Sequence, residues 1–536
     1  MERSPSFRMA QTLRERTYLA GVLILGLTAC LGYLGVELFF LDGGLGFPLD
    51  DSWIHLQFAR NLSLGDGLTY NPGEPVAGST APLWTAVLSI LFLLPGPVTV
   101  WVKLAGIAIT AAAMHAVFVL GRELGLGPGL AAFATAMTAL TGWILWAALS
   151  GMEIPLFMLL SLWGIILHLR EQRQGSGGVW AFSVLALSAL ARPEGFLLVV
   201  LAGVDRLLNW ERSGDGELKL SLGNWRSVLK GALVGLILVT PIAVLNWSFS
   251  GSVLPTTFGA KSGGLTRLLP DLRYLYEVMS VFLQAQPYML FLSLGGALVL
   301  VERLGTKMSR GLLPGLWLVG LPLAYSLISP PGKFLVGNFG RYFYPLFPVL
   351  IVLGTLALAR AARAMGSKVI AGRLGLPLRA IAMLLMIWPT ISSATLGAGR
   401  YIQAVANIED GDVKMAKWLG QRVDSRAVLA VNDVGALKYF LPNRVIDLAG
   451  IIHPQASLYI EEAKAAGRDW RTGVLRILEE TQPDFLVIFP GWYPGLEQLN
   501  PGFVPRFELE IPNNIALGGD RIVVYSTPWT RYPLRP

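Results

Sequence analysis

The chain has 536 residues, of which 53% are hydrophobic and only 15% are charged, and its formal net charge at pH 7 is +8. Soluble globular proteins carry about 25% charged residues, so this composition excludes an ordinary soluble domain and indicates a membrane protein. The positive charge does not indicate a nucleic-acid partner, because the basic residues form short clusters between apolar runs, as in the cytoplasmic loops of membrane proteins.

Apolar runs long enough to cross a bilayer follow one another along residues 1–398. The first run follows a segment with several arginines and is longer than the apolar part of a secretory signal, so we expect an uncleaved span with a cytoplasmic N-terminus. The positive-inside rule orients the later runs. Together they predict about eleven spans: 18–41, 98–120, 130–149, 154–169, two short helices within 180–204, 231–248, 282–301, 312–328, 342–358 and 381–396.

Two segments depart from simple spans. Residues 83–94 are short and lack a basic flank, so we expect a helix that dips into the membrane within a first outer loop of about residues 42–97. Residues 180–204 are interrupted by Arg192-Pro193-Glu194-Gly195, and two short helices meeting there would keep the basic segment that follows in the cytoplasm. Irregular backbone at this depth is tolerated only where it lines a cavity or packs on protein, so Arg192 and Glu194 are candidate site residues.

The composition changes after residue 398, where amphipathic helical stretches alternate with short β-like runs at 427–431, 485–488 and 521–525. The sequence therefore predicts a mainly α, multi-pass transmembrane helical bundle (residues 1–398) followed by a small extracytoplasmic α/β domain (residues 399–536). Asp433 and Asp447 flank strand ends in that domain, and turn chemistry is sufficient to explain them.

The first outer loop begins a helix with two adjacent carboxylates, Asp50 and Asp51, and His55 follows one turn later on the face of Asp51. Desolvation against a membrane raises the pKa of such carboxylates, which suits a general base that takes a proton from a sugar hydroxyl. Alternatively, Asp50 caps the helix and Asp51 interacts favourably with its dipole. The two residues alone leave both interpretations open.

The loop has a family resemblance. Residues 50–62, with Asn71-Pro72-Gly73-Glu74 and Gly78-Ser79-Thr80 after them, resemble the first outer loop of bacterial GT-C glycosyltransferases, most of all the arabinofuranosyltransferase-like branch. The likeness extends over the whole chain in order, and the first loop is its most specific part. Further similar segments are 150–157, 192–195, 254–261, 340–342, 432–437 and 445–450.

The resemblance implies a GT-C fold and an inverting transfer in which an acceptor hydroxyl attacks a sugar carried on a polyprenyl phosphate. In that reaction Asp50 or Asp51 would be the base, and Lys261 or Arg341 would bind the donor phosphate. The residues expected to bind or orient substrate are His55, Arg60, Glu153, Arg192 and Glu194. The topology expected above places these segments on the outer side, where they can converge.

Several of these residues have simpler explanations. Glu153 can cap the helix that follows it, and Lys261 and Arg341 can be snorkelling residues at span ends. Arg192 and Glu194 can pair only with each other, and a structural His55 is an equally simple reading. No obligatory cofactor is expected. A divalent cation could be held by Asp50, Asp51, Glu153 and His55, but no tight ligand spacing demands one.

The sequence thus predicts a multi-pass protein of the bacterial plasma membrane that transfers a sugar from a polyprenyl-phosphate donor to a cell-envelope glycan or lipid acceptor. A flippase or transporter of lipid-linked sugars is the main alternative, and it would need a path open to both faces. A polysaccharide polymerase or ligase would carry its large outer loop late among the spans. A structural scaffold would leave the adjacent aspartates without a purpose.

Overall fold

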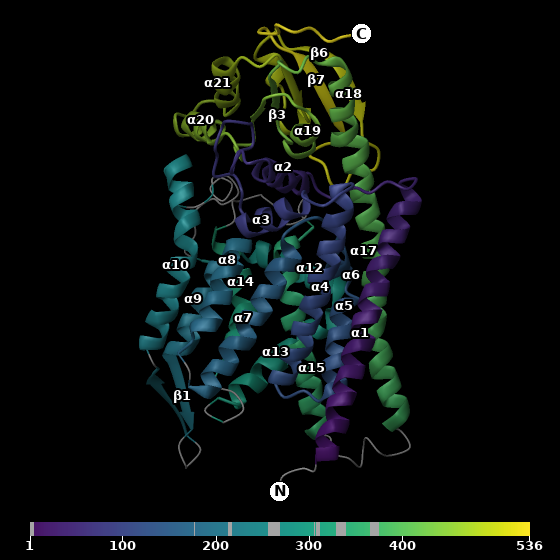
Figure 1. The fold of residues 1–536 in the computed structure, drawn as a ribbon, viewed down its shortest axis with the longest axis vertical. Coiled ribbons are helices and arrows are strands. Elements are labelled where there is room, and N and C mark those ends of the chain that lie inside the picture. Colours follow the sequence, from purple (N-terminus) through teal and green to yellow (C-terminus); the bar gives the residue numbers. More distant parts are fainter. Residues whose placement is uncertain are drawn as a thin grey trace.

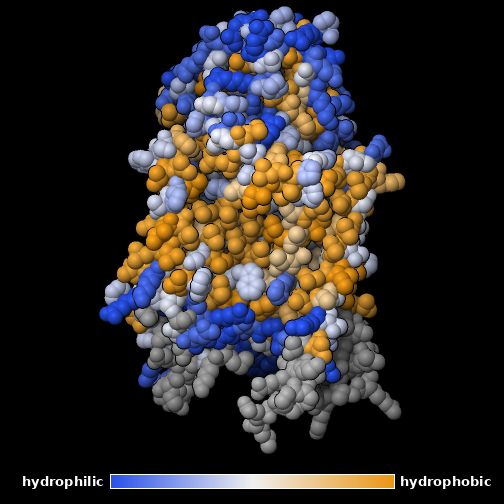
Figure 2. Space-filling view, viewed as in Figure 1, coloured by the Kyte–Doolittle hydropathy of each residue, from blue (hydrophilic) through white to orange (hydrophobic). Residues whose placement is uncertain are grey.

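The computed structural model describes residues 5–175, 177–212, 217–223, 225–253, 255, 269–304, 306, 311–328, 339–364 and 375–536. These residues form a long helical bundle with a smaller α/β domain at the end opposite the N-terminus (Figure 1). An apolar belt covers the middle of the bundle, and hydrophilic residues cover the α/β domain and the other end of the belt (Figure 2). A belt of this kind can contact the hydrocarbon core of a bilayer, as the surface of a multi-pass membrane protein must.

Within the described residues, five helical segments are long and apolar enough to cross a membrane, or seven if each of two bent helix pairs is counted as one span. The five comprise α1 (Pro5–Phe40), α4 (Val98–Glu123), α7 (Ile154–Gln174), α10 (Trp225–Ser250), and the 3₁₀ turn η2 (Arg341–Leu346) with α15 (Phe347–Ala364). The shorter apolar helices are α3 (Pro82–Leu91), α8 (Val179–Ala191) and α14 (Leu313–Ile328). The number of spans predicted from the sequence, about eleven, is larger than this and stays a prediction.

The two bent pairs correct the predicted bounds. The predicted span 130–149 is divided into α5 (Pro128–Ala139) and α6 (Gly142–Leu149), which meet at 62°. The predicted span 282–301 begins inside α12 (Leu272–Ala285), and α13 (Pro287–Glu302) leaves it at 112°. Pro287 explains this second break, because proline has no N–H to donate and disfavours a helical residue before it.

The break predicted within residues 180–204 is present. Helix α8 ends at Ala191, Arg192 is extended, and α9 (Glu194–Leu207) returns along α8. A Cβ at Gly195 would lie 2.3 Å from the backbone nitrogen of Ala189, so this corner can close only with glycine. A two-stranded ribbon, β1 (Leu208–Arg212) with β2 (Leu218–Leu222), follows α9. The corner therefore fixes Arg192 in an extended conformation between the end of α8 and the start of α9.

The α/β domain follows directly from a long helix. Helix α17 (Gly375–Ile408) continues through a π-helical turn, η3 (Glu409–Val413), into α18 (Lys414–Arg422). The predicted boundary at 398/399 falls inside α17, so one helix carries the chain from the bundle into the domain. The sheet has the strand order β4-β3-β5-β7-β6, of which the first three strands are parallel. Its strands are β3 (Leu429–Val431), β4 (Val445–Asp447), β5 (Phe485–Ile488), β6 (Val504–Glu510) and β7 (Arg521–Ser526).

The helices of the domain are α19 (Gly435–Phe440), α20 (Pro454–Ala465) and α21 (Arg471–Thr481). The first outer loop fills the space between this domain and the bundle with α2 (Asp50–Leu64) and α3 (Figure 1). The ring of Trp53 lies 4.9 Å from that of Tyr439 in α19. Asn71 pairs with both the N–H and the carbonyl of Val445, each at 3.0 Å, and so acts as a short extension of the sheet edge. The first loop is consequently part of the domain's packing.

Candidate active site

The carboxylate of Asp50 caps a helix, but not its own. Leu49 is the N-cap residue of α2 and makes no side-chain cap hydrogen bond. The two oxygens of Asp50 instead accept hydrogen bonds from the backbone N–H groups of Gly435 and Ala436, both at 2.7 Å. These are among the N–H groups that the first turn of α19 cannot satisfy internally. A Cβ at Gly435 would lie 2.2 Å from the carbonyl oxygen of Asp50, so glycine is required for this approach.

Arg60 contacts the other end of α19. Its guanidinium donates to the Tyr439 carbonyl at 2.8 Å and to Gln57 at 2.5 Å, and lies 4.8 Å from the centre of the Tyr439 ring. Asp50 and Arg60 thus hold the two ends of one short helix of the outer domain. These contacts give Arg60 a structural purpose in joining α2 to α19, whereas the sequence predicted that it binds substrate.

A buried polar cluster brings together most of the predicted site residues. Nε2 of His55 lies 3.1 Å from Oε2 of Glu153, and Nη1 of Arg192 lies 3.1 Å from Oε1 of Glu153. Arg192 also binds Glu194 at 2.9 Å. Beside them Arg341 forms an ion pair with Asp51. We call Asp51, His55, Glu153, Arg192, Glu194 and Arg341 the polar cluster.

The polar cluster draws on distant segments: the first turns of α2, the residue before α7, the corner between α8 and α9, and the start of η2. The hydroxyl of Tyr325 in α14 adds a hydrogen bond of 2.7 Å to Glu194. Glu153 makes no side-chain cap bond to α7, so the capping explanation does not hold. Arg192 does more than pair with Glu194, because it bridges two glutamates. Three carboxylates and two guanidinium groups thus lie together, and all of them except the partly exposed Asp51 are buried.

Removing the Arg192 guanidinium, which bridges Glu153 and Glu194, should destabilise the protein. In Arg192→Met, Glu153 and Glu194 would remain buried without their partner, and breaking such a pair costs about 3–5 kcal/mol. The matched control is Arg170→Met, because Arg170 is 39% exposed and its pair with Glu123 should contribute under about 1 kcal/mol. Thermal unfolding of both detergent-solubilised variants measures the difference. Equal shifts in Tm would contradict the bridging role.

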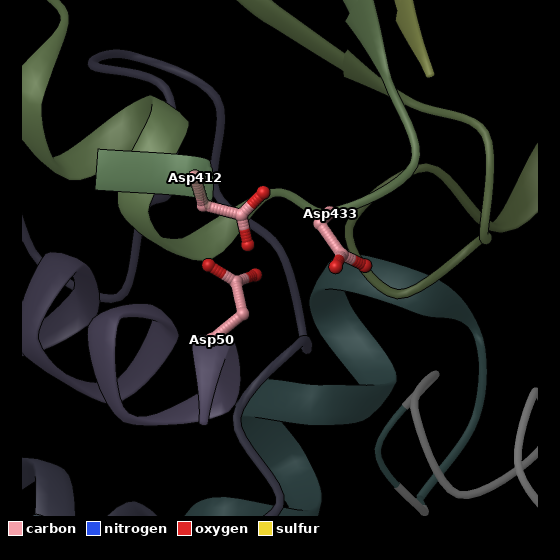
Figure 3. Close-up of side chains that lie close together, drawn as sticks. All are labelled: Asp50, Asp412 and Asp433. Atoms are coloured by element: carbon pink, nitrogen blue, oxygen red, sulfur yellow. The ribbon is translucent and has the colours of Figure 1, made fainter. Parts of the chain in front are cut away.

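Two further aspartates lie beside Asp50. The side chains of Asp50, Asp412 and Asp433 point toward one another (Figure 3), and one oxygen of each lies within 4.8 Å of the others. We call them the three-aspartate cluster. Burial is the main cause that raises the pKa of Asp50 to about 7, and the charges of Asp51 and Asp447 add to it, while the two amide hydrogen bonds from α19 oppose it.

Asp412 was not predicted from the sequence, and turn chemistry alone was the explanation expected for Asp433. That explanation does fit Asp447, which accepts backbone hydrogen bonds from Ala449 at 2.7 Å and Ile452 at 2.8 Å. The available signal for Asp412 was an acidic run, Glu409-Asp410-Gly411-Asp412, inside a helix that is otherwise apolar before it and basic after it. Lys261, predicted to bind the donor phosphate, lies outside the described residues.

The comparisons with known proteins divide between the two parts of the chain. A family model described as "Domain of unknown function (DUF8728)" matches residues 400–525, most of the outer domain. No curated protein sequence matches the chain. Solved structures do match over nearly its whole length, with low sequence identity.

ArnT from Cupriavidus metallidurans bound to undecaprenyl phosphate is 15% identical, with a TM-score of 0.55 over 95% of this chain and 98% of ArnT. The apo oligosaccharyltransferase of Archaeoglobus fulgidus is 13% identical, with a TM-score of 0.56 over 96% of this chain and 75% of that protein. AglB of Archaeoglobus fulgidus, in complex with an inhibitory peptide and a dolichol-phosphate, is 12% identical, with a TM-score of 0.53 over 96% and 75% of the two chains.

These likenesses establish the fold. The chain has the GT-C fold, mostly helical with a small sheet in its C-terminal region, as the sequence predicted. The more specific resemblance to the arabinofuranosyltransferase-like branch stays a prediction.

Proposed function

We propose that the protein is an inverting glycosyltransferase that moves a sugar from a polyprenyl-phosphate donor to a hydroxyl of a cell-envelope glycan or lipid. The observation that carries the proposal is the ion pair of Asp51 with Arg341 next to the partly buried carboxylate of Asp50. These groups belong to the first outer loop and the start of η2, where the apolar bundle meets the polar domain (Figure 2). Structures with the same fold were determined with undecaprenyl phosphate and with a dolichol-phosphate, which supports a lipid-phosphate donor.

In the proposed reaction Asp50 is the general base. It takes the proton of the acceptor hydroxyl while the oxygen forms a bond to the anomeric carbon and the bond from that carbon to the phosphate oxygen breaks. A carboxyl group with a pKa of about 7 is well suited to this work near neutral pH. Asp51 is a poorer choice, because its pair with Arg341 stabilises the carboxylate without a proton.

Arg341 binds the donor phosphate. Its guanidinium is 3% exposed and can exchange Asp51 for two phosphate oxygens, and it stabilises the negative charge that the leaving phosphate gains. Glu153, held by His55 and Arg192, orients the acceptor or the sugar. The rest of the polar cluster holds these groups in place.

The same arrangement supports a proposal for the location. We place the protein in a bacterial plasma membrane, with the N-terminus in the cytoplasm and the α/β domain on the extracytoplasmic face. The N-terminus and the domain lie at opposite ends of the bundle, and the N-terminal segment is rich in arginine, which supports this orientation.

A donor panel tests the proposal. Purified protein in vesicles would receive radiolabelled polyprenyl-phosphate pentoses and hexoses together with an envelope glycan acceptor. We expect one donor to be consumed and its label to appear in the acceptor with inverted anomeric configuration. Label that crosses the bilayer without joining an acceptor would overturn the proposal and favour a flippase. The panel also separates a pentosyltransferase from a hexosyltransferase.

A further inference from the structure

The three-aspartate cluster joins three segments that are distant in sequence. Asp50 is in the first turn of α2, Asp412 is in the π-helical turn η3, and Asp433 follows strand β3. Asp412 is only 1% exposed, and neither of its carboxylate oxygens has a hydrogen-bond partner among the described residues. Asp50 and Asp433 are only partly buried, so a ligand can reach the cluster from their side.

The surroundings of Asp412 disfavour an ionised carboxylate that binds no cation. The charges that act on it are those of Asp433 and Asp50, both of the same sign, and with burial they raise its pKa well above the ordinary value. Asp433 also faces Asp50, Asp51 and Asp447, and its pKa is raised in the same way. A buried carboxylate with no partner is costly unless it is protonated or binds a cation.

The π-helical turn decides which acidic residue faces inward. It inserts one extra residue into the helix between α17 and α18, and such turns often occur at functional sites. Asp412 points to Asp50 (Figure 3), whereas Asp410 in the same turn is exposed. The helix thereby places a single carboxylate, out of three acidic residues in the turn, in the cluster.

We propose that Asp50, Asp412 and Asp433 bind one divalent cation at the junction between the first outer loop and the outer domain. The three ligands are all carboxylates, so a hard ion such as Mg²⁺, Ca²⁺ or Mn²⁺ is favoured over Zn²⁺, which prefers histidine and cysteine. An ionised carboxylate has about four lone-pair positions. Asp50 uses two for the amides of α19 and has room for the ion on the same side as the other aspartates.

The site differs from the one that the sequence suggested. The sequence placed a possible cation on the aspartate pair, Glu153 and His55, but Arg192 and His55 already hold Glu153, and Arg341 holds Asp51. Two of the three proposed ligands, Asp412 and Asp433, come instead from residues 399–536. If the proposed function holds, a cation on Asp50 would also lower the pKa of that base and polarise an acceptor hydroxyl beside it.

Manganese binding tests the proposal without any substrate. Detergent-purified protein would be titrated with Mn²⁺ near pH 8, and the free ion measured by electron paramagnetic resonance. We expect one bound ion per wild-type chain, and at least a tenfold weaker affinity in Asp412→Asn and in Asp433→Asn. The matched control is Asp410→Asn, which removes an exposed carboxylate from the same turn and should bind as wild type does.

The Tm of each metal-free variant serves as the control for correct folding. Asp412→Asn removes like-charge repulsion, so its Tm should not fall below that of the wild type. Added Mn²⁺ should raise the Tm of the wild type and of Asp410→Asn, but not that of Asp412→Asn or Asp433→Asn. The proposal is overturned if the wild type binds no Mn²⁺ at millimolar concentration, or if Asp412→Asn binds as tightly as the wild type. Either result would leave a cluster of carboxyl groups that share protons. A protein that binds Mn²⁺ but transfers no sugar would instead refute the proposed function.

Discussion

Replacing Asp50 with asparagine is expected to lower the rate of sugar transfer by about 10²- to 10⁴-fold, the usual contribution of a positioned general base. The asparagine oxygen can still accept one amide hydrogen bond from α19, so the outer domain should stay docked on α2. The measurement is the initial rate with the donor identified by the panel. Asp66→Asn is the matched control, because Asp66 is an exposed aspartate just past the end of the same helix.

The pH profile gives a second check on the same base. The pKa of Asp50 is raised to about 7, so the group is mostly protonated below that pH and ionised above it. A base must be ionised to act, so in protein freed of divalent cations with a chelator, wild-type transfer should fall about tenfold per pH unit below pH 7 and level off above it. Residual transfer by Asp50→Asn should lack this dependence. A flat wild-type profile from about pH 5 to pH 8 would refute the assignment of Asp50 as the base.

Replacing Arg341 with glutamine should lower transfer by about 10²- to 10³-fold, as expected when a donor to a developing negative charge is lost. The loss arises at the phosphate, so the donor KM should rise as well, while the acceptor KM should not. Arg400→Gln is the matched control. Arg400 is an exposed arginine on α17 that contacts Gln284 and the Trp143 ring, and its loss should leave the rate unchanged.

Arg341→Gln also leaves Asp51 without its partner, so the variant needs a separate test of folding. Arg341→Lys keeps the charge but not the two-pronged geometry, and should recover part of the rate. If Arg341→Gln has a normal donor KM and rate while its Tm falls, Arg341 is a structural partner of Asp51. The phosphate would then have to bind elsewhere.

The sequence predicted the bundle and the outer domain because their signals are local. Apolar runs, basic clusters and the change of composition after residue 398 each occupy a short window. The break at Arg192 could be predicted for the same reason, since proline and glycine mark it. The bends at Thr141 and Gln286 were not predicted, because a continuous apolar run has the same composition whether its helix is straight or bent.

The candidate site could be predicted only in part. The resemblance identified Asp51, Glu153, Arg192 and Arg341, and the structure brings them together. It did not identify Asp412, because that residue becomes a site candidate only through its proximity to Asp50 and Asp433, which are distant in the chain. The sequence left open whether Asp50 caps its own helix or acts as a base, and it did not indicate that Asp50 binds the N-terminus of α19, because its partner Gly435 is equally distant in the chain.

The hydrogen bond from Gly435 to Asp50 joins residues 385 positions apart, and this separation has a consequence for biosynthesis. A ribosome adds about 5–20 residues per second, so the nascent chain carries Asp50 for about 20–80 s before its partner exists. During that interval the loop is present in the membrane without the groups that hold its carboxylate. A newly made molecule therefore completes its candidate active site only after its last spans have been inserted and the segment after them has folded.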